Sequence, residues 1–407
     1  MEKEIIKKKS FSVTVDIVAN RVNSLRKITE TTSTVRVYSE GFIGVAGQVG
    51  ETDLAVLEAQ AVKNLENKLP YPCLLSENQV GSVDARKQII DVDKILDISR
   101  SLMLRLREAV PDFAASNKIQ YFENETEYSN SKGTSLSYKG NELAVVLTFK
   151  HKDTANIMDF YYVYDDNEYN EDKVVDDIKL LCDKFLMPAS IEKGKYKIIA
   201  MPEFFIANAL TNFTGDMYAS NASIFKNRLN EKIFDDKVSI LFNKSLSKVN
   251  ISFFDDEGET AENHISYLVK NGVFTSVIAN KKTAAEYKLP RTATSEASYD
   301  GIPSFGFSGL EFSSTAADIY ELIGDEKAIF VVVASGGDIT SGGDFATPVQ
   351  VSFLVENGRI TGKLPPLNVH GNIEDYLGVS FVGATKKAFF SSEKDLRVVA
   401  EMSVEQM

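Results

Sequence analysis

The sequence of 407 residues predicts an α+β fold: an N-terminal α/β region with antiparallel strands, then a C-terminal antiparallel β-sheet or barrel-like domain with a buried central helix. Apolar and polar residues alternate with a period of two in both halves, as in half-buried strands. Two Asn-Gly pairs, at 271–272 and 357–358, lie between short apolar runs and predict tight hairpins. The stretch 204–216 follows Pro202 and carries no charged side chain before Asp216, which is typical of a helix inside the protein.

The length predicts more than one domain, because single hydrophobic cores stop growing at roughly 250–300 residues. We expect an N-terminal α/β domain over residues 1–90, a middle α+β domain over 91–190 and a C-terminal β-rich domain over 191–407. The last boundary falls in the segment 188–195, where Pro, Gly and charged residues separate two well-patterned stretches.

In the first 190 residues, the strands are predicted from period-two alternation and the helices from apolar residues spaced three and four apart. The predicted strands are 11–18, 33–38, 41–46, 118–127, 134–138, 143–151 and 158–164, and the predicted helices are 52–68, 93–110 and 174–185. Three lysines at 7–9 precede the first of these strands, and we expect them to form a solvated tail.

The C-terminal half is predicted to be mainly β-structure. The predicted strands are 197–201, 238–242, 249–254 and 327–334, the hairpins are 267–274 and 353–360, and a short helix covers 314–322. The strand at 327–334 is apolar nearly throughout, so it should be buried on both faces. Gly215 is expected to end the central helix in a left-handed turn.

The composition describes an ordinary globular protein, with 43% hydrophobic and 25% charged residues. The 45 basic and 58 acidic residues give a net charge of −13, which disfavours direct binding to nucleic acid. No apolar run approaches the ~18 residues of a membrane span, and no leader peptide is visible. Cys73 and Cys182 form no CxxC pair, so we expect two buried free thiols in a reducing, cytoplasmic compartment.

Several blocks within residues 201–384 resemble the TldD/PmbA (TldE) family. The sequence Phe-Asp-Asp-Glu-Gly at 254–258, followed by 268–273, is similar to the family's FDDEG and LIENGIL blocks. The sequence Asp-Ile-Thr-Ser-Gly at 338–342 is similar to its DITSG block, and 353–358 and 371–373 follow in the family's order. Whether the family's reported connection with DNA gyrase, as a modulator, extends to this chain stays open.

This resemblance implies a pairing of two subunit types. TldD-type subunits are zinc metallopeptidases whose zinc helix carries HExxxH, with a further cysteine ligand near the C-terminus. In such an enzyme the metal acidifies a water molecule and polarises the peptide carbonyl. TldE-type subunits lack these residues and complete the cleft.

With Gly215 and Asp216 as the anchor, the resemblance places the two histidines at Ile206 and Thr211 and the glutamate at Ala207. No cysteine occurs after residue 383. Apolar side chains cannot bind zinc, and a hydroxyl is a poor ligand beside imidazole or thiolate. The chain therefore resembles the non-catalytic TldE/PmbA-type subunit, with no metal or cofactor of its own.

The partners implied are a TldD-type zinc subunit and an unfolded peptide, held as an added strand. A stand-alone homodimeric binding or structural protein that has lost peptidase function is the alternative.

The candidates for contact with a peptide or a partner are Asp338, Ile339, Thr340, Ser341 and Gly342. Glycine in this segment would allow a substrate backbone to approach closely, and a purely structural turn is the other interpretation.

Two further groups of side chains are weighed against enzyme chemistry. Asp255, Asp256 and Glu257 could serve an enzyme that uses carboxylates, but acids clustered in a turn are usually hydrated, which is what we expect for these three. His264 is expected to be a surface strand residue beside these acids, and His370 a loop residue.

Overall fold

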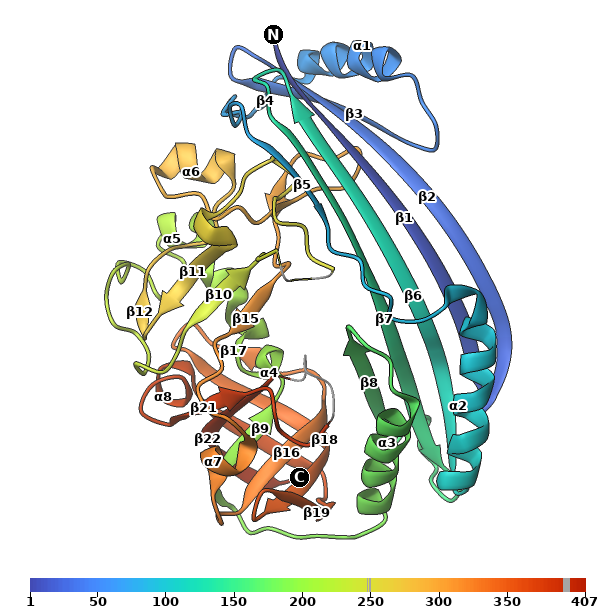
Figure 1. Cartoon of the computed structure of the whole chain (residues 1–407). Coiled ribbons are helices and arrows are strands. Elements are labelled where there is room, and N and C mark those ends of the chain that lie inside the picture. The colour runs from blue at the N-terminus through green and yellow to red at the C-terminus, as the bar shows by residue number, and fades with distance from the viewer. Residues whose placement is uncertain (247, 249, 391–395) are drawn as a thin grey trace.

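The computed structural model describes residues 1–246, 248, 250–390 and 396–407. A long, curved and mainly antiparallel sheet from the N-terminal part arches beside a C-terminal part that contains a closed barrel and a smaller sheet (Figure 1). The predicted α+β class with a barrel-like C-terminal domain is confirmed. None of the helices in the described residues combines the length and hydropathy needed to cross a bilayer.

The N-terminal sheet has the strand order β4-β3-β2-β1-β6-β7-β5, with β8 paired to β7. Its strands are β1 (Glu2–Val18), β2 (Arg21–Ser39), β3 (Phe42–Val49), β4 (Leu69–Pro70), β5 (Val80–Asp84), β6 (Phe113–Asn130), β7 (Ser135–His151) and β8 (Phe160–Asp166). Strand β1 pairs antiparallel with both β2 and β6. Residues before and after position 90 therefore share one sheet.

Two predictions in this sheet are wrong. The strands expected at 134–138 and 143–151 are one strand, β7, because Gly140 and Asn141 between them stay paired with Asn124 and Glu123 of β6. The three lysines at 7–9 belong to β1 and pair with both neighbouring strands, so they are not a tail.

Three longer helices accompany the sheet, together with single 3-10 turns. They are α1 (Leu54–Asn64), η1 (Leu65–Asn67), η2 (Val92–Lys94), α2 (Ile95–Ala109) and α3 (Glu171–Phe185). The side chain of Asp53 caps α1 by accepting from the Ala55 N–H, and Asn170 caps α3 in the same way. Helix α3 lies between the sheet and the barrel (Figure 1).

The barrel closes because its strands pair in a ring, β16-β9-β22-β20-β18 and back to β16. Strand β9 pairs parallel with β16, and the other pairs are antiparallel. The strands of the ring and its edges are β9 (Gly194–Ala200), β16 (Ala328–Ala334), β17 (Asp338–Ile339), β18 (Asp344–Glu356), β19 (Arg359–Lys363), β20 (Leu367–Asn372), β21 (Phe381–Thr385) and β22 (Arg397–Gln406).

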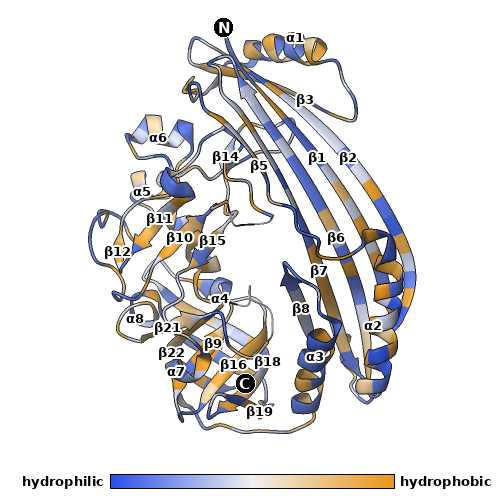
Figure 2. Cartoon of the chain, in the orientation of Figure 1, coloured by the Kyte–Doolittle hydropathy of each residue, from blue (hydrophilic) through white to orange (hydrophobic). Residues whose placement is uncertain are grey.

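The barrel strands separate two hydrophobic cores. Successive residues contact different cores: Ile198 packs with the helical segment that follows β9, whereas Ile199 packs with the N-terminal sheet. In β16, Ile329 packs in the same core as Ile198, and Phe330 packs in the same core as Ile199. This is expected for a strand buried on both faces. Figure 2 shows the barrel strands as mainly hydrophobic, whereas much of β1 and β2 is hydrophilic.

The remaining elements form the smaller sheet, a two-stranded sheet and short helices. They are β10 (Ile240–Asn243), η4 (Glu262–His264), β11 (Ile265–Lys270), β12 (Val273–Phe274), α6 (Lys281–Tyr287), β13 (Ser295–Glu296), β14 (Ser304–Phe305), β15 (Leu310–Phe312), α7 (Ile319–Ile323) and α8 (Ile373–Tyr376). Both Asn-Gly hairpins are confirmed, with positive φ at each Asn and Gly. The strand predicted at 249–254 is wrong over 250–254, and Val249 lies outside the described residues.

Candidate functional site

The predicted central helix is three short helical pieces that follow β9. They are α4 (Pro202–Ile206), the 3-10 helix η3 (Ala207–Phe213) and α5 (Gly215–Ala219). The backbone leaves the α conformation at Ile206, where φ is −126°. The prediction of one continuous helix is therefore wrong.

Gly215 begins α5 and does not form the left-handed end that was predicted. Its N–H donates to the carbonyl of Ile278 at 2.9 Å. A Cβ at this position would lie 2.5 Å from Cγ2 of Thr283, so close packing explains the glycine.

One side of this segment is buried and the other is exposed. Phe205, Ile206, Ala209 and Phe213 belong to the hydrophobic core. The hydroxyl of Tyr376 donates to the carbonyl of Phe205 at 2.9 Å, which anchors the buried side.

The exposed side carries two of the three positions that the family resemblance assigns to zinc chemistry. Ala207 and Thr211 are exposed, whereas Ile206 is 2% exposed and packs in the core. None of the three offers an imidazole, thiolate or carboxylate, so they do not fit a zinc ion. Among the described residues, no group of three His, Cys, Asp or Glu side chains could hold a metal.

A cavity of about 520 Å³ lies beside this exposed side. Its walls come from α4 and η3, from β8 and from the barrel strands β16 and β18. Phe204 of α4 and Phe345 of β18 meet edge to face with 5.8 Å between ring centroids, and Ala207 lies on the same wall. This size is within the range of about 300–1,000 Å³ that ligand pockets occupy. We call this cavity the aromatic cleft.

The aromatic cleft contains a few polar groups among its apolar side chains. The guanidinium of Arg397 lies 5.3 Å from the ring centroid of Phe330 and 5.8 Å from that of Phe390. Asp165 and Glu203 supply carboxylates. A mainly apolar cavity with few polar groups is the usual form of a site for an organic ligand.

Strand β8 supplies the wall that faces the helical segment. Within the described part of the chain, the one strand that pairs with β8 is β7. Its side chains alternate: Phe160, Tyr162 and Tyr164 are buried in the core, whereas Tyr161 and Val163 are more exposed and line the aromatic cleft. The sequence predicted this strand but contained no signal that it lies against residues 40 positions later.

The segment 338–342 lies near this cleft but outside its lining. Thr340 closes a turn by accepting through Oγ1 from the N–H groups of Gly342 and Asp344, at 3.3 and 3.1 Å. Asn372 donates to the carbonyl of Gly342 at 2.9 Å. Ser341 is exposed and Ile339 is half-buried in the edge strand β17. These hydrogen bonds are those of a structural turn, and the role of Asp338 to Gly342 in peptide or partner binding stays a prediction.

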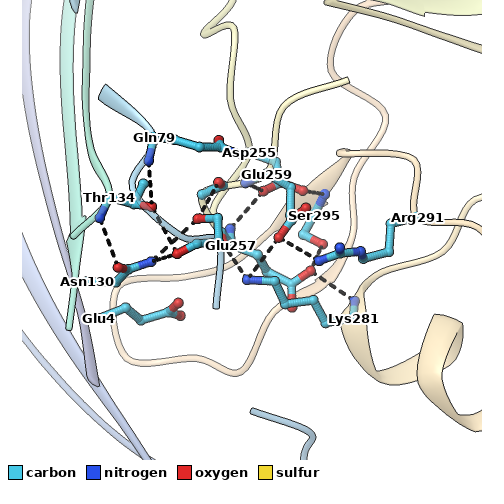
Figure 3. A network of polar contacts seen from close by, with 12 residues as sticks. Glu4, Gln79, Asn130, Thr134, Asp255, Glu257, Glu259, Lys281, Arg291 and Ser295 are labelled. Atoms are coloured by element: carbon cyan, nitrogen blue, oxygen red, sulfur yellow. Dashed lines mark hydrogen bonds and ion pairs between the residues drawn. The ribbon is translucent and has the colours of Figure 1, made fainter. Parts of the chain in front are cut away.

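The acidic turn at 255–257 is not hydrated, which corrects the sequence prediction. Asp255 and Glu257 are 4% and 1% exposed and lie in a polar network between the two parts of the chain (Figure 3). Asp255 accepts from three backbone N–H groups, those of Glu257, Glu259 and Ser295, at 2.9, 3.0 and 2.9 Å. Glu257 accepts from the Ser295 hydroxyl at 2.6 Å and from the hydroxyl of Tyr71.

Burial raises the pKa of both carboxyl groups in this network. For Glu257, burial and the nearby charge of Asp255 raise the pKa to about 7. Burial also raises the pKa of Asp255, against the backbone N–H groups that lower it. Because their oxygens accept hydrogen bonds that join the two parts of the chain, we interpret these acids as structural.

Three other sequence predictions differ from the structure. His264 is half-buried, with its ring 5.5 Å from that of Phe253, and is not a surface strand residue. His370 lies in β20 and not in a loop. Cys182 is buried as expected, but Cys73 is exposed.

These features define a class: an α+β barrel protein with a cleft whose helical wall carries no histidine or cysteine. Residues 193–395 match the model of the PmbA/TldA metallopeptidase C-terminal domain. The chain belongs to the PmbA/TldD family.

Curated relatives are metalloproteases. A metalloprotease of Methanocaldococcus jannaschii is 28% identical over 192 residues, which cover 46% of this chain and 42% of the relative. A metalloprotease of Archaeoglobus fulgidus is 25% identical over 300 residues, covering 70% and 69%. A zinc metalloprotease TldD homologue of Saccharolobus solfataricus is 25% identical over 186 residues, covering 44% and 41%. The matched region thus spans less than half of the first of these relatives.

Solved structures share the fold over the whole chain. TldE from Thermococcus kodakarensis superimposes with a TM-score of 0.80 at 15% identity, covering 100% of this chain and 95% of that one. A proposed modulator of a DNA gyrase from Thermotoga maritima superimposes with a TM-score of 0.76 at 16% identity, covering 99% and 96%.

Proposed function

We propose that this chain is a non-catalytic, TldE/PmbA-like partner of a TldD-type zinc metallopeptidase, and that it helps to bind unfolded peptides for processing. The proposal rests on one observation. The cleft lies beside a helical segment in which the positions assigned to HExxxH hold no group that could bind zinc or transfer a proton. Ile206, Ala207 and Thr211 stand at these positions. We place this activity in the cytoplasm, with the zinc supplied by the partner.

Strand β8 in the wall of the aromatic cleft supports binding of an extended peptide. An extended peptide bound through its main chain gains hydrogen bonds that give affinity with little dependence on sequence. Tyr161 and Val163 from β8, with Phe204 and Phe345 opposite, offer apolar surface to alternate side chains of that peptide. Such recognition suits a substrate that is unfolded and varied in sequence.

The first test adds this protein to the TldD-type zinc subunit of the same genome. Cleavage of an unstructured peptide such as reduced, alkylated casein is measured with each protein alone and with the mixture. We expect activity in the mixture and none from this chain alone. The proposal fails if the mixture cleaves no faster than the zinc subunit, or if the purified chain contains stoichiometric zinc by elemental analysis.

The second test concerns the aromatic cleft itself. Ala207→Trp places an indole in the cleft, whereas Ala59→Trp places the same group on the exposed side of the remote helix α1. Anisotropy of a fluorescent, unstructured peptide should show weaker binding for Ala207→Trp and unchanged binding for Ala59→Trp. Equal binding by both variants would place the peptide elsewhere.

A stand-alone, homodimeric binding protein is the second candidate. One observation favours it: the family model matches residues 193–395, so the N-terminal half, including β8, lies outside the match. Light scattering of the pure protein and capture of its partners from native cytosol separate the two candidates. A homodimer that captures no zinc subunit would favour the second.

A further inference from the structure

A second cavity lies between the N-terminal sheet and the acidic turn, apart from the aromatic cleft. Its volume is about 390 Å³, and none of its lining residues lines the aromatic cleft. Lys8 of β1, Thr32 of β2 and Thr126 of β6 form the sheet side. Lys244 and Asp256 form part of the opposite side. We call this cavity the polar cavity.

The side chain of Lys244 is the unusual feature of the polar cavity. The residue is only 6% exposed. Within the described part of the chain, its ammonium group has no hydrogen-bond partner and no carboxylate within 4.0 Å. A largely buried ammonium without a protein partner is costly unless water or a ligand in the adjoining cavity solvates it.

Two carboxylates whose charges act on this ammonium, those of Asp255 and Asp256, already accept from other groups. Asp255 accepts from three backbone N–H groups. Asp256 accepts from Lys8 Nζ at 2.7 Å and from the N–H of Ala297 at 2.8 Å. Burial lowers the pKa of Lys244, and the charges of Asp255, Asp256 and Glu296 oppose that shift. These three acids and Lys8 all line the polar cavity, so the ammonium group lies at its wall.

The charges of the lining limit what could pair with Lys244. Five acidic residues and three lysines line the polar cavity, which leaves an excess of negative charge and disfavours a simple anion. Glu30 and Glu296 are exposed at its rim, and no hydrogen bond or ion pair to a described residue is made by the carboxylate of Glu30. A ligand that carries both a carboxylate for Lys244 and an ammonium for these rim acids would satisfy both sets of groups.

We propose that the polar cavity binds a small zwitterion of the amino acid or dipeptide class, with its carboxylate on Lys244 and its ammonium toward Glu30 and Glu296. Charge-assisted hydrogen bonds between ammonium and carboxylate are among the strongest that proteins form. The cavity volume lies within the range that small-molecule sites occupy. This site is independent of the peptide binding proposed for the aromatic cleft.

Three matched dipeptides test the two charges separately by isothermal titration calorimetry at pH 7. Glycylglycine carries both charges, N-acetylglycylglycine carries only the carboxylate, and glycylglycinamide carries only the ammonium. We expect glycylglycine to bind at least about tenfold more tightly than either of the others, since each loses one charged hydrogen-bonding group. Absence of binding by glycylglycine at millimolar concentration, or equal binding by all three, would overturn the proposal.

The variant Lys244→Met retains the length of the side chain and removes its charge. We expect it to fold and to lose at least about tenfold in affinity for glycylglycine. Lys248→Met is the matched control, because Lys248 is paired with Glu311 at 2.6 Å and does not line the polar cavity. Unchanged affinity in Lys244→Met would overturn the assignment. If this variant does not fold, the comparison of the three dipeptides on the native protein still decides the question.

Discussion

Breaking the ion pair between Glu4 and Arg36 is expected to destabilise the protein strongly, because both side chains are buried and the remaining charge would lack its partner. They are 0% and 2% exposed, and Arg36 Nη1 donates to Glu4 Oε1 at 2.8 Å. Glu4 also accepts from the hydroxyls of Tyr38 and Tyr128 at 2.9 and 2.8 Å. Arg36 additionally donates to the carbonyl of Asp256 at 2.6 Å, so the pair joins the N-terminal sheet to the acidic turn.

Glu4→Gln removes the negative charge and leaves a guanidinium buried without compensation. Loss of one partner of a buried pair costs about 3–5 kcal/mol, and we expect a loss in free energy of unfolding of this size. In the double variant Glu4→Gln/Arg36→Met the second substitution removes the uncompensated charge. The coupling energy between the two sites should therefore be about 2 kcal/mol or more.

Urea unfolding measured by far-UV circular dichroism supplies these values, since the chain has no tryptophan for fluorescence. Size-exclusion chromatography across the same urea range checks that a single transition is observed. The control is Glu58→Gln, which removes the ion pair between Glu58 and Lys3. Their side chains are 34% and 39% exposed, respectively. It should cost less than about 1 kcal/mol. A Glu4→Gln loss no larger than this control, or strict additivity in the double variant, would refute the reasoning.

Three further outcomes are expected. Burial raises the pKa of Glu257 from 4.5 to about 7, so between pH 4.5 and 7 the folded state binds more protons than the unfolded state. The free energy of unfolding should therefore fall by up to about 3 kcal/mol as the pH rises from 4.5 to 7, and Glu257→Gln should remove most of that slope in urea titrations. Gly215→Ala should lower the free energy of unfolding by about 1–3 kcal/mol, because its Cβ would lie 2.5 Å from Thr283 Cγ2, and an unchanged melting temperature would contradict this packing. Ellman's reagent should modify Cys73 in the native protein and Cys182 only after unfolding, whereas two reactive thiols in the native state would contradict the burial of Cys182.

The sequence predicted best those elements whose signals are local. Both Asn-Gly hairpins have the positive φ angles that their turn chemistry requires. Helices α2 and α3 follow their apolar periodicity. The lysines at 7–9 were misjudged because a strand is defined by its partners, and their partners lie at 31–33 and 125–127.

The candidate site was predictable only in part, for the same reason. The resemblance located Ile206, Ala207 and Thr211, but nothing local indicates that β8 lies opposite Ala207 across the aromatic cleft. For the acidic turn, the sequence led to a wrong prediction of burial. Asp255 and Glu257 look solvated in sequence, whereas donors from distant positions, including Tyr71 and Ser295, surround them in the fold.

The helical wall of the aromatic cleft is held in place without any metal ligand. Phe213 packs against Phe225 and Phe274, with ring centroids 4.8 and 5.6 Å apart. Asp216 accepts from the hydroxyl of Thr283 at 2.8 Å, just beyond the 3-10 helix. Packing and hydrogen bonds therefore hold the helical wall of the cleft in place. The shape of the cleft depends on the core, whereas its chemistry depends on the exposed side chains that line it.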